Sequence, residues 1–236
     1  MDDQGLPAAL IFDLQRGSPF SFKCQVCSAC CYNKTIRVSP YEALRLAGNL
    51  GLTTTEFYEK YTEEGSAVLR LKADAGCIFL TPRGCGVHPD RPLVCRLYPL
   101  GQIVEKEGKE RFGSMPPHPD CLGLYGSDGR VKTYLESQQV DPYFFYDKIY
   151  TAIYKKMVAN VGDTEEKVKN QEGRGKKRDG RNAGFSEFLR LTWLDIDASV
   201  EAYCSDNCIK SPTALDKRVA IHIKAIESWL ASSGLA

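Results

Sequence analysis

The chain has 236 residues, 43% of them hydrophobic, so it is long enough to bury a core. Its formal net charge of +1 favours neither a polyanionic nor a polycationic partner. No apolar run approaches the length that spans a bilayer, and the acidic N-terminal segment lacks the basic-then-apolar order of a secretory signal. We therefore expect a cytoplasmic protein with no membrane partner.

Helix-capping patterns appear twice in the first half of the chain. Ser39 followed by proline and Glu42 is typical of a helix start, and Gly51 is placed to end that helix. Thr53 and Glu56 repeat the capping pattern. From 77 to 121 seven prolines rule out long helices, and the best strand candidates are 78–80 and 101–105.

The second half of the chain is predicted to be helical. A helix from Asp141 should turn Phe145, Ile149, Ile153 and Met157 to one buried face, because they recur every four residues. Further helices are expected over 185–204 and from Ser211 onward.

Together these patterns predict an α+β fold, mostly helical, with a small irregular cysteine-rich metal-binding core that contains short strands. N- and C-terminal helices should flank this core. The expected segments are a cysteine-cluster domain over 1–135, a helix packing on it over 136–163, a flexible charged linker over 164–184 and a C-terminal helical segment over 185–236. The linker is predicted because its composition offers too little apolar surface to bury.

Ten cysteines are the most informative feature of the composition. In a reducing cytosol clustered cysteines are more often metal ligands or catalytic thiols than disulfides. Cys24, Cys27 and Cys30 follow the two-residue spacing of zinc knuckles and iron–sulfur loops. Cys31 adjoins Cys30, and neighbouring side chains point apart, so this pair favours two metal ions or a polynuclear cluster.

The remaining ligands are expected from Cys77, Cys85, Cys95 and Cys121. Eight thiols divide into two four-coordinate sets, but the sequence does not say which four belong together. Cys204 and Cys208 form a weaker pattern, typical of free, partly buried cysteines.

Basic residues flank the cysteines, and four thiolates around a divalent metal leave a local negative charge. Arg91 and Arg96 are therefore expected to donate hydrogen bonds to sulfur around the centre, although solvated arginines are the alternative. His88 and His118 also lie near cysteines, but eight thiols already suffice as ligands.

The order of these motifs resembles a known family. The run CxxCxxCC, then Arg91-Pro92-x2-Cys95-Arg96-x-Tyr98-Pro99, then Cys121-x-Gly123, is similar to the CxxCxxCC (YkgJ-like) cysteine-cluster proteins, described as zinc- or iron-chelating. The resemblance covers about residues 20–125 and implies that all eight named cysteines form the metal site. Ser28 stands where the family usually has glycine, and Leu122 where proline is common. Flagellin lysine N-methylases are similar, more distantly, through the same region.

Three functions follow as hypotheses. The first is a metal-binding protein that holds iron, as an ion or an iron–sulfur cluster, or zinc. The paired Cys30 and Cys31 favour iron. The second is an iron–sulfur enzyme or electron carrier, for example a protein lysine N-methylase with a protein substrate; no residue outside the motif suggests a base or nucleophile. The third, a zinc module bound to nucleic acid or protein, is disfavoured for nucleic acid because the helix after Ser39 has a single arginine.

Overall fold

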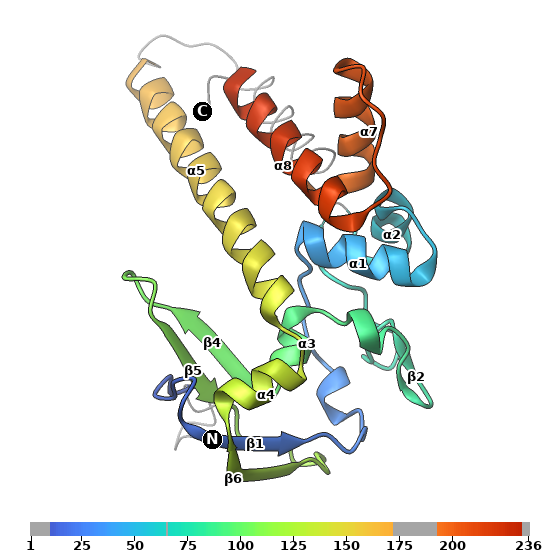
Figure 1. Cartoon of the computed structure of the whole chain (residues 1–236), viewed down its shortest axis with the longest axis vertical. Coiled ribbons are helices and arrows are strands. Elements are labelled where there is room, and N and C mark those ends of the chain that lie inside the picture. Colours follow the sequence, from blue (N-terminus) through green and yellow to red (C-terminus); the bar gives the residue numbers. More distant parts are fainter. Residues whose placement is uncertain (1–9, 65, 172–192, 233–236) are drawn as a thin grey trace. The chain divides into compact units, whose positions relative to one another are not determined.

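The computed structural model describes residues 10–64, 66–171 and 193–232. It confirms the α+β class, since helices combine with short strands that pair in two-stranded antiparallel sheets (Figure 1). In chain order the elements are β1 (Pro19–Lys23), the 3₁₀ turn η1 (Ala29–Cys31), α1 (Pro40–Leu50), α2 (Thr54–Tyr61), β2 (Leu80–Thr81), β3 (Gly84–Cys85), the 3₁₀ turn η2 (His88–Asp90), α3 (Leu93–Leu97), β4 (Leu100–Val104), β5 (Glu110–Ser114), β6 (Leu124–Arg130), α4 (Val131–Ser137), α5 (Asp141–Gln171), α7 (Ile196–Asp206) and α8 (Leu215–Ser232).

Two compact units make up the fold, and neither is continuous in sequence. Unit 1 comprises Met1–Ile36 and Leu71–Phe144, and unit 2 comprises Arg37–Arg70 and Phe145–Ala236. The linear division into four segments stays a prediction. Helix α5 continues as far as Gln171, past the expected start of the charged linker. The rest of that linker, and 185–192 of the helix expected next, lie outside the described residues.

Unit 1 contains short paired strands and one short helix among its prolines, in agreement with the predicted absence of long helices from 77 to 121. Strands β4 and β5 form a hairpin, and β2 pairs with β3 in a tighter one. Strand β1 pairs with β6, about a hundred residues away, and α4 packs on both (Figure 1). Their apolar faces form one core, made of Phe20, Leu97, Leu100, Phe112, Val131, Tyr134, Leu135 and Val140.

Unit 2 contains the two helices whose starts the capping patterns predict. The Ser39–Glu42 and Thr53–Glu56 boxes are both present, and Gly51 ends α1 in the left-handed conformation. Helix α7 begins at Ile196, because the Asp195 side chain accepts a hydrogen bond from the backbone N–H of Ala198.

Two details of the helical prediction are wrong. Helix α8 begins at Leu215 and not at Ser211; the Ser211 hydroxyl and the Pro212 carbonyl accept hydrogen bonds from Arg218 instead of joining the helix. Phe145 does not lie on the buried face of α5, since it is 60% exposed. Ile153 is buried as expected, together with Tyr150, whose hydroxyl is 2.7 Å from Nδ1 of His222.

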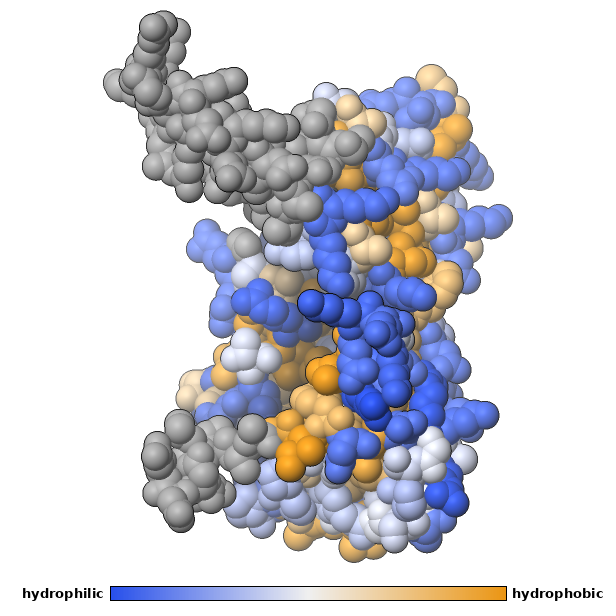
Figure 2. Space-filling model, turned by 90° about the vertical axis from the view of Figure 1, so that its left-hand side faces the viewer, coloured by the Kyte–Doolittle hydropathy of each residue, from blue (hydrophilic) through white to orange (hydrophobic). Residues whose placement is uncertain are grey.

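Hydrophilic residues cover much of the face shown in Figure 2, and hydrophobic residues lie between them in separate patches. Within the described ranges, no helix combines the length and the apolar character that a membrane span requires.

One ion pair supports the β4–β5 hairpin, and its contribution should depend on pH. Arg16 donates from Nε to Glu110 Oε2 (2.6 Å) and from Nη2 to Oε1 (2.9 Å), which lowers the pKa of Glu110. The pair therefore stabilises the fold fully above the ordinary pKa of a glutamate, and this contribution is lost as the pH falls through the lowered value.

We predict that Glu110→Gln lowers the unfolding free energy by about 0.5–1 kcal/mol at neutral pH, because both partners are partly exposed and screened by solvent. Urea unfolding at several pH values measures this difference, which should vanish in acid. Glu107→Gln, at an exposed residue of the same hairpin, is the control. If Glu110→Gln lowered the unfolding free energy by the same amount at low pH, the stabilising role of the Arg16–Glu110 ion pair would be contradicted.

Candidate metal centre

The segment that holds the first four cysteines turns sharply. After β1 ends at Lys23, Val26 (φ 54°) and Ser28 (φ 62°) both adopt the left-handed conformation, and η1 then carries Cys30 and Cys31. Each left-handed residue bends the chain, so the four thiols stay within one compact loop. Glycine would adopt this conformation without a Cβ penalty, in line with the glycine that the family resemblance leads one to expect at the position of Ser28.

A second segment docks on this loop through its backbone. The N–H of Cys77 donates to the carbonyl of Cys31 (2.8 Å), and the N–H of Asn33 donates to the carbonyl of Ala75 (3.0 Å). These hydrogen bonds place Cys77 beside Cys31 although 45 residues of chain separate them. Cys85 lies in β3, and Cys95 lies in α3.

Cys121 reaches the loop through the pairing of β1 with β6. Because β1 and β6 are antiparallel with Lys23 opposite Leu124, the residues after β1 and before β6 meet at one end of this sheet. There the N–H of Leu122 donates to Cys27 Sγ (3.5 Å), and the N–H of Gly123 donates to Cys121 Sγ (3.4 Å). Backbone N–H groups thus already point at two of the sulfur atoms.

The thiols perturb one another's pKa values, which shows that they are neighbours. A hydrogen bond with Cys31 lowers the pKa of Cys30 to about 7, and its partner Cys31 has a raised pKa because of the same contact and of burial. Burial raises the pKa of Cys95 to about 12, and nearby Cys77, Cys85 and Cys30 raise it further.

The remaining resolved shifts extend this network. Burial raises the pKa of Cys77 and that of Cys85. The Leu122 N–H lowers the pKa of Cys27, and a hydrogen bond with Cys121 lowers it too. All ten cysteines of the chain have free thiols, so the minor alternative of disulfide staples finds no support; Cys204 is buried and Cys208 exposed, both in unit 2.

The two arginines expected around the sulfur atoms differ in their contacts. Arg96 is buried, stacks 4.3 Å from the centroid of the Tyr143 ring, and donates to that hydroxyl and to the carbonyls of Pro89, Arg91 and Gln138. It therefore fixes the loop around α3. The charge of Arg91 lowers the pKa values of Cys30, Cys85 and Cys95, so Arg91 lies close to the thiols.

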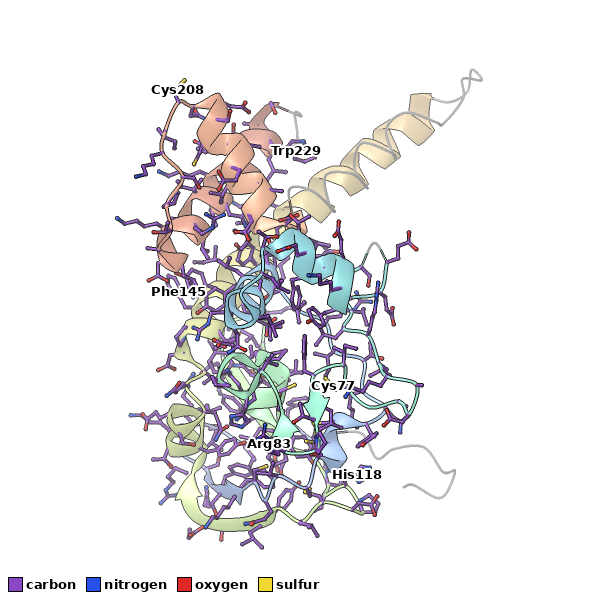
Figure 3. The ribbon with its side chains drawn as sticks, turned by 90° about the vertical axis from the view of Figure 1, so that its right-hand side faces the viewer. Cys77, Arg83, His118, Phe145, Cys208 and Trp229 are labelled. Atoms are coloured by element: carbon purple, nitrogen blue, oxygen red, sulfur yellow. The ribbon has the colours of Figure 1, made fainter. Side chains whose placement is uncertain are left out.

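The two histidines have other partners than sulfur. His88 contacts Arg91, and Nδ1 of His118 accepts a hydrogen bond from the N–H of Asp120. In Figure 3, Cys77 and His118 lie in the same region of unit 1.

The eight thiols suit a thiophilic metal chemically, but their side chains are not arranged around a common point. Among the described residues, no three His, Cys, Asp or Glu side chains surround a common point closely enough to hold a metal ion. The cysteines are neighbours in a network, and metal binding would require some of their side chains to rotate. All-sulfur sets of this kind suit zinc and iron–sulfur centres alike.

A groove of about 450 Å³ opens beside Cys27. Lys72 and Asp74 lie on its wall; the Lys72 ammonium donates to the carbonyl of Leu80, and Asp74 accepts from the N–H of Gly76. The groove therefore gives solvent a route to the cysteine loop, which a metal ion needs to enter.

Two further residues of this region were not anticipated from the sequence. Tyr98 lies three residues after Cys95, and Tyr125 lies four residues after Cys121. Both hydroxyl groups are buried near thiols. Tyr98 belongs to the motif that resembles the CxxCxxCC family, but nothing in the sequence gave it a role, and for Tyr125 proximity to Cys121 was the only signal.

Comparison with known proteins agrees with the cysteine spacing. Residues 23–118 match the family model CxxCxxCC, described as "Putative zinc- or iron-chelating domain". The match includes seven of the eight named cysteines and ends three residues before Cys121. An uncharacterized protein of Methanocaldococcus jannaschii is 29% identical over 164 residues, which is 65% of this chain and 80% of the relative. No solved structure matches the chain.

Gly123 tests whether the Cys121 end of the network matters for metal. A Cβ atom at Gly123 would lie 2.3 Å from Phe22 Cε2 and 3.2 Å from Cys121 Sγ, so no side chain fits. We predict that Gly123→Ala displaces Cys121 and lowers bound metal per chain, as measured by elemental analysis. Gly17→Ala is the control, because a Cβ there has nothing within 4 Å. Equal metal content in the two variants would argue against a ligand role for Cys121.

Acid should release the metal. Cys77, Cys85 and Cys95 have raised pKa values and keep their protons at neutral pH without a metal, so the metal must displace these protons on binding. We predict that the apparent affinity falls about tenfold per pH unit for each net proton displaced, in chelator competition on the metal-loaded full-length protein. An affinity that does not change with pH would contradict thiolate ligation.

Proposed function

We propose, from the premise that residues 23–118 are a CxxCxxCC domain, that this protein binds iron or zinc in two adjacent centres made of thiolates. The observation that carries the proposal is that backbone hydrogen bonds bring thiols together from three separate segments of the chain, joining Cys77 to Cys31 and Leu122 to Cys27. The pKa shifts of the thiols agree with this arrangement. The proposed ligands are Cys24, Cys27, Cys30, Cys31, Cys77, Cys85, Cys95 and Cys121.

The perturbations also suggest how the eight ligands divide. Cys77 raises the pKa values of both Cys31 and Cys95, and Cys85 also raises the pKa of Cys95. Cys31, Cys77, Cys85 and Cys95 would therefore hold one centre. We call them the Cys95 set.

Cys27 is hydrogen-bonded with Cys121, and the charge of Cys30 raises the pKa of Cys27. Together with Cys24, which precedes Cys27 at the same two-residue spacing, these residues would hold the other centre. We call Cys24, Cys27, Cys30 and Cys121 the Cys121 set. The adjacent Cys30 and Cys31 would then serve different sets. Their side chains do not point apart as expected, since the two thiols are hydrogen-bonded with each other, so the two centres would lie side by side.

Metal binding would supply free energy to a unit with little regular structure of its own. Unit 1 consists of two-stranded sheets and short helices, and seven of its eight cysteines have free, partly buried thiols. A bound divalent metal compensates converging thiolates, so folding and binding are coupled. Arg91 would lie next to the Cys95 set and reduce its net negative charge.

We favour iron, because two adjacent centres with Cys30 and Cys31 as ligands suit a multimetal arrangement. An iron–sulfur enzyme with a protein substrate stays a prediction from sequence, as does a cytoplasmic location. Anaerobic purification separates the metals: iron–sulfur centres give a brown protein, whereas zinc gives a colourless one.

Serine substitution tests the ligands and their division together. We predict that Cys27→Ser and Cys95→Ser each lose one of the two centres, and that the double variant binds no metal, because serine is a poor ligand for thiophilic metals. Elemental analysis and the visible spectrum measure the loss, and circular dichroism follows the fold. Cys208→Ser, an exposed cysteine of unit 2, should change nothing.

Unchanged metal content in Cys27→Ser and Cys95→Ser would refute the ligand assignment. Complete loss of metal in each single variant, with the fold retained, would instead refute the division into two sets and indicate one shared centre.

A further inference from the structure

Buried polar atoms without a partner are costly, so each one in a folded protein calls for an explanation. In the part of the chain that the structure describes, four side-chain atoms are of this kind: Tyr58 Oη, Arg91 Nε, Tyr98 Oη and Tyr125 Oη. Three of the four belong to unit 1.

These three unpaired donors lie around the thiol network. The charge of Arg91 lowers the pKa values of Cys30, Cys85 and Cys95, as described above. Burial raises the pKa of Tyr98, as do the neighbouring Tyr125 and then Cys121. Burial likewise raises the pKa of Tyr125, and the charges of Cys121 and Cys30 add to the effect. The geometry places the two tyrosines in the same region: a Cβ atom at Gly123 would meet both the Phe22 ring and Cys121 Sγ, so this ring lies beside that sulfur, and both tyrosines pack against Phe22.

The rings of the two tyrosines are held in place. The centroid of the Phe22 ring lies 5.9 Å from that of Tyr98 and 4.9 Å from that of Tyr125, in edge-on geometry in both cases. Tyr134 packs against Phe22 as well, and its own hydroxyl donates to the Tyr98 carbonyl. The two free hydroxyls are thus carried on fixed rings, which limits where they can find an acceptor.

The two hydroxyls do not satisfy one another. The side-chain contact between them perturbs the pKa of each, and Tyr98 has a second such contact with Cys121, yet neither hydroxyl has a partner at full hydrogen-bond geometry among the described residues. A protonated thiol is a weak acceptor, whereas a metal-bound thiolate is anionic and accepts hydrogen bonds well. The missing acceptor is therefore of the kind that metal binding creates at Cys121 and Cys30.

We propose that Tyr98 and Tyr125 donate hydrogen bonds to the metal-bound thiolates of the Cys121 set, at Cys121 and Cys30. This inference rests on the proposed function and goes beyond it by naming two positioning residues that tune the centre. A hydrogen bond to a thiolate withdraws electron density from sulfur, so these donors would stabilise the loaded centre and change its electronic spectrum.

Phenylalanine substitution removes each hydroxyl and keeps the ring. The probe is cobalt(II), loaded into the full-length protein, because its thiolate charge-transfer bands report on the electron density at sulfur. We predict that Tyr98→Phe and Tyr125→Phe keep full cobalt stoichiometry, shift these bands to lower energy, and weaken binding in chelator competition. For the double variant the loss should be about tenfold or more.

Tyr58→Phe is the matched control, because Tyr58 also has a buried, unpaired hydroxyl but belongs to unit 2. It should leave the bands and the affinity at their wild-type values. A purely structural role of Tyr98 and Tyr125 would alter thermal stability without moving the bands.

Wild-type bands and affinity in the double variant, with circular dichroism showing an intact fold, would overturn the inference and leave the metal centre standing. A wild-type chain that takes up no cobalt and contains no metal as purified would overturn the proposed function, and this inference with it. If Tyr98→Phe fails to fold, Tyr125→Phe alone gives the same two outcomes at the neighbouring hydroxyl.

Discussion

Burial and mutual repulsion oppose the formation of thiolates, and this constraint acts on the cysteines that unit 1 brings together. Cys31, Cys77, Cys85 and Cys95 raise each other's pKa values or are raised by burial, so the folded chain crowds groups that resist becoming anions together. Without a metal the thiols stay protonated and neutral, and a cation at their centre would stabilise the thiolate form. The arrangement makes sense as a ligand set that is completed by metal, and it is unfavourable as a set of free thiolates.

The surrounding fold brings these groups together through backbone contacts and one buried cation. The Cys77 N–H bonds the Cys31 carbonyl, and the β1–β6 pairing brings Cys24 and Cys121 to the same end of a sheet. Arg96 ties the loop before α3 to the end of α4 by donating to the carbonyls of Pro89 and Gln138. Short elements suffice for this purpose, because each needs only to fix one or two cysteines and the apolar core lies beside them.

Local features of the fold were predictable from the sequence. The capping boxes at Ser39 and Thr53 involve residues three positions apart, so the sequence contains all the information that they need. The same is true of the prolines that restrict 77–121 to short elements. The cysteine spacing and the family resemblance likewise identified the matched domain before any geometry was known.

Long-range features were not predictable in the same way. That β1 pairs with β6, and that the two units are each discontinuous, depends on contacts between residues far apart in the chain. The face of α5 that is buried depends on its partners, so the exposed Phe145 was misassigned. The grouping of the thiols and the unpaired hydroxyls of Tyr98 and Tyr125 also emerge only in three dimensions.

X-ray absorption on the metal bound by the anaerobically purified full-length protein is the most direct measurement of the central claim. Thiolate ligation predicts a nearest shell of sulfur alone, at about 2.3 Å. A nearest shell of nitrogen or oxygen, or a protein that contains no metal, would contradict the account.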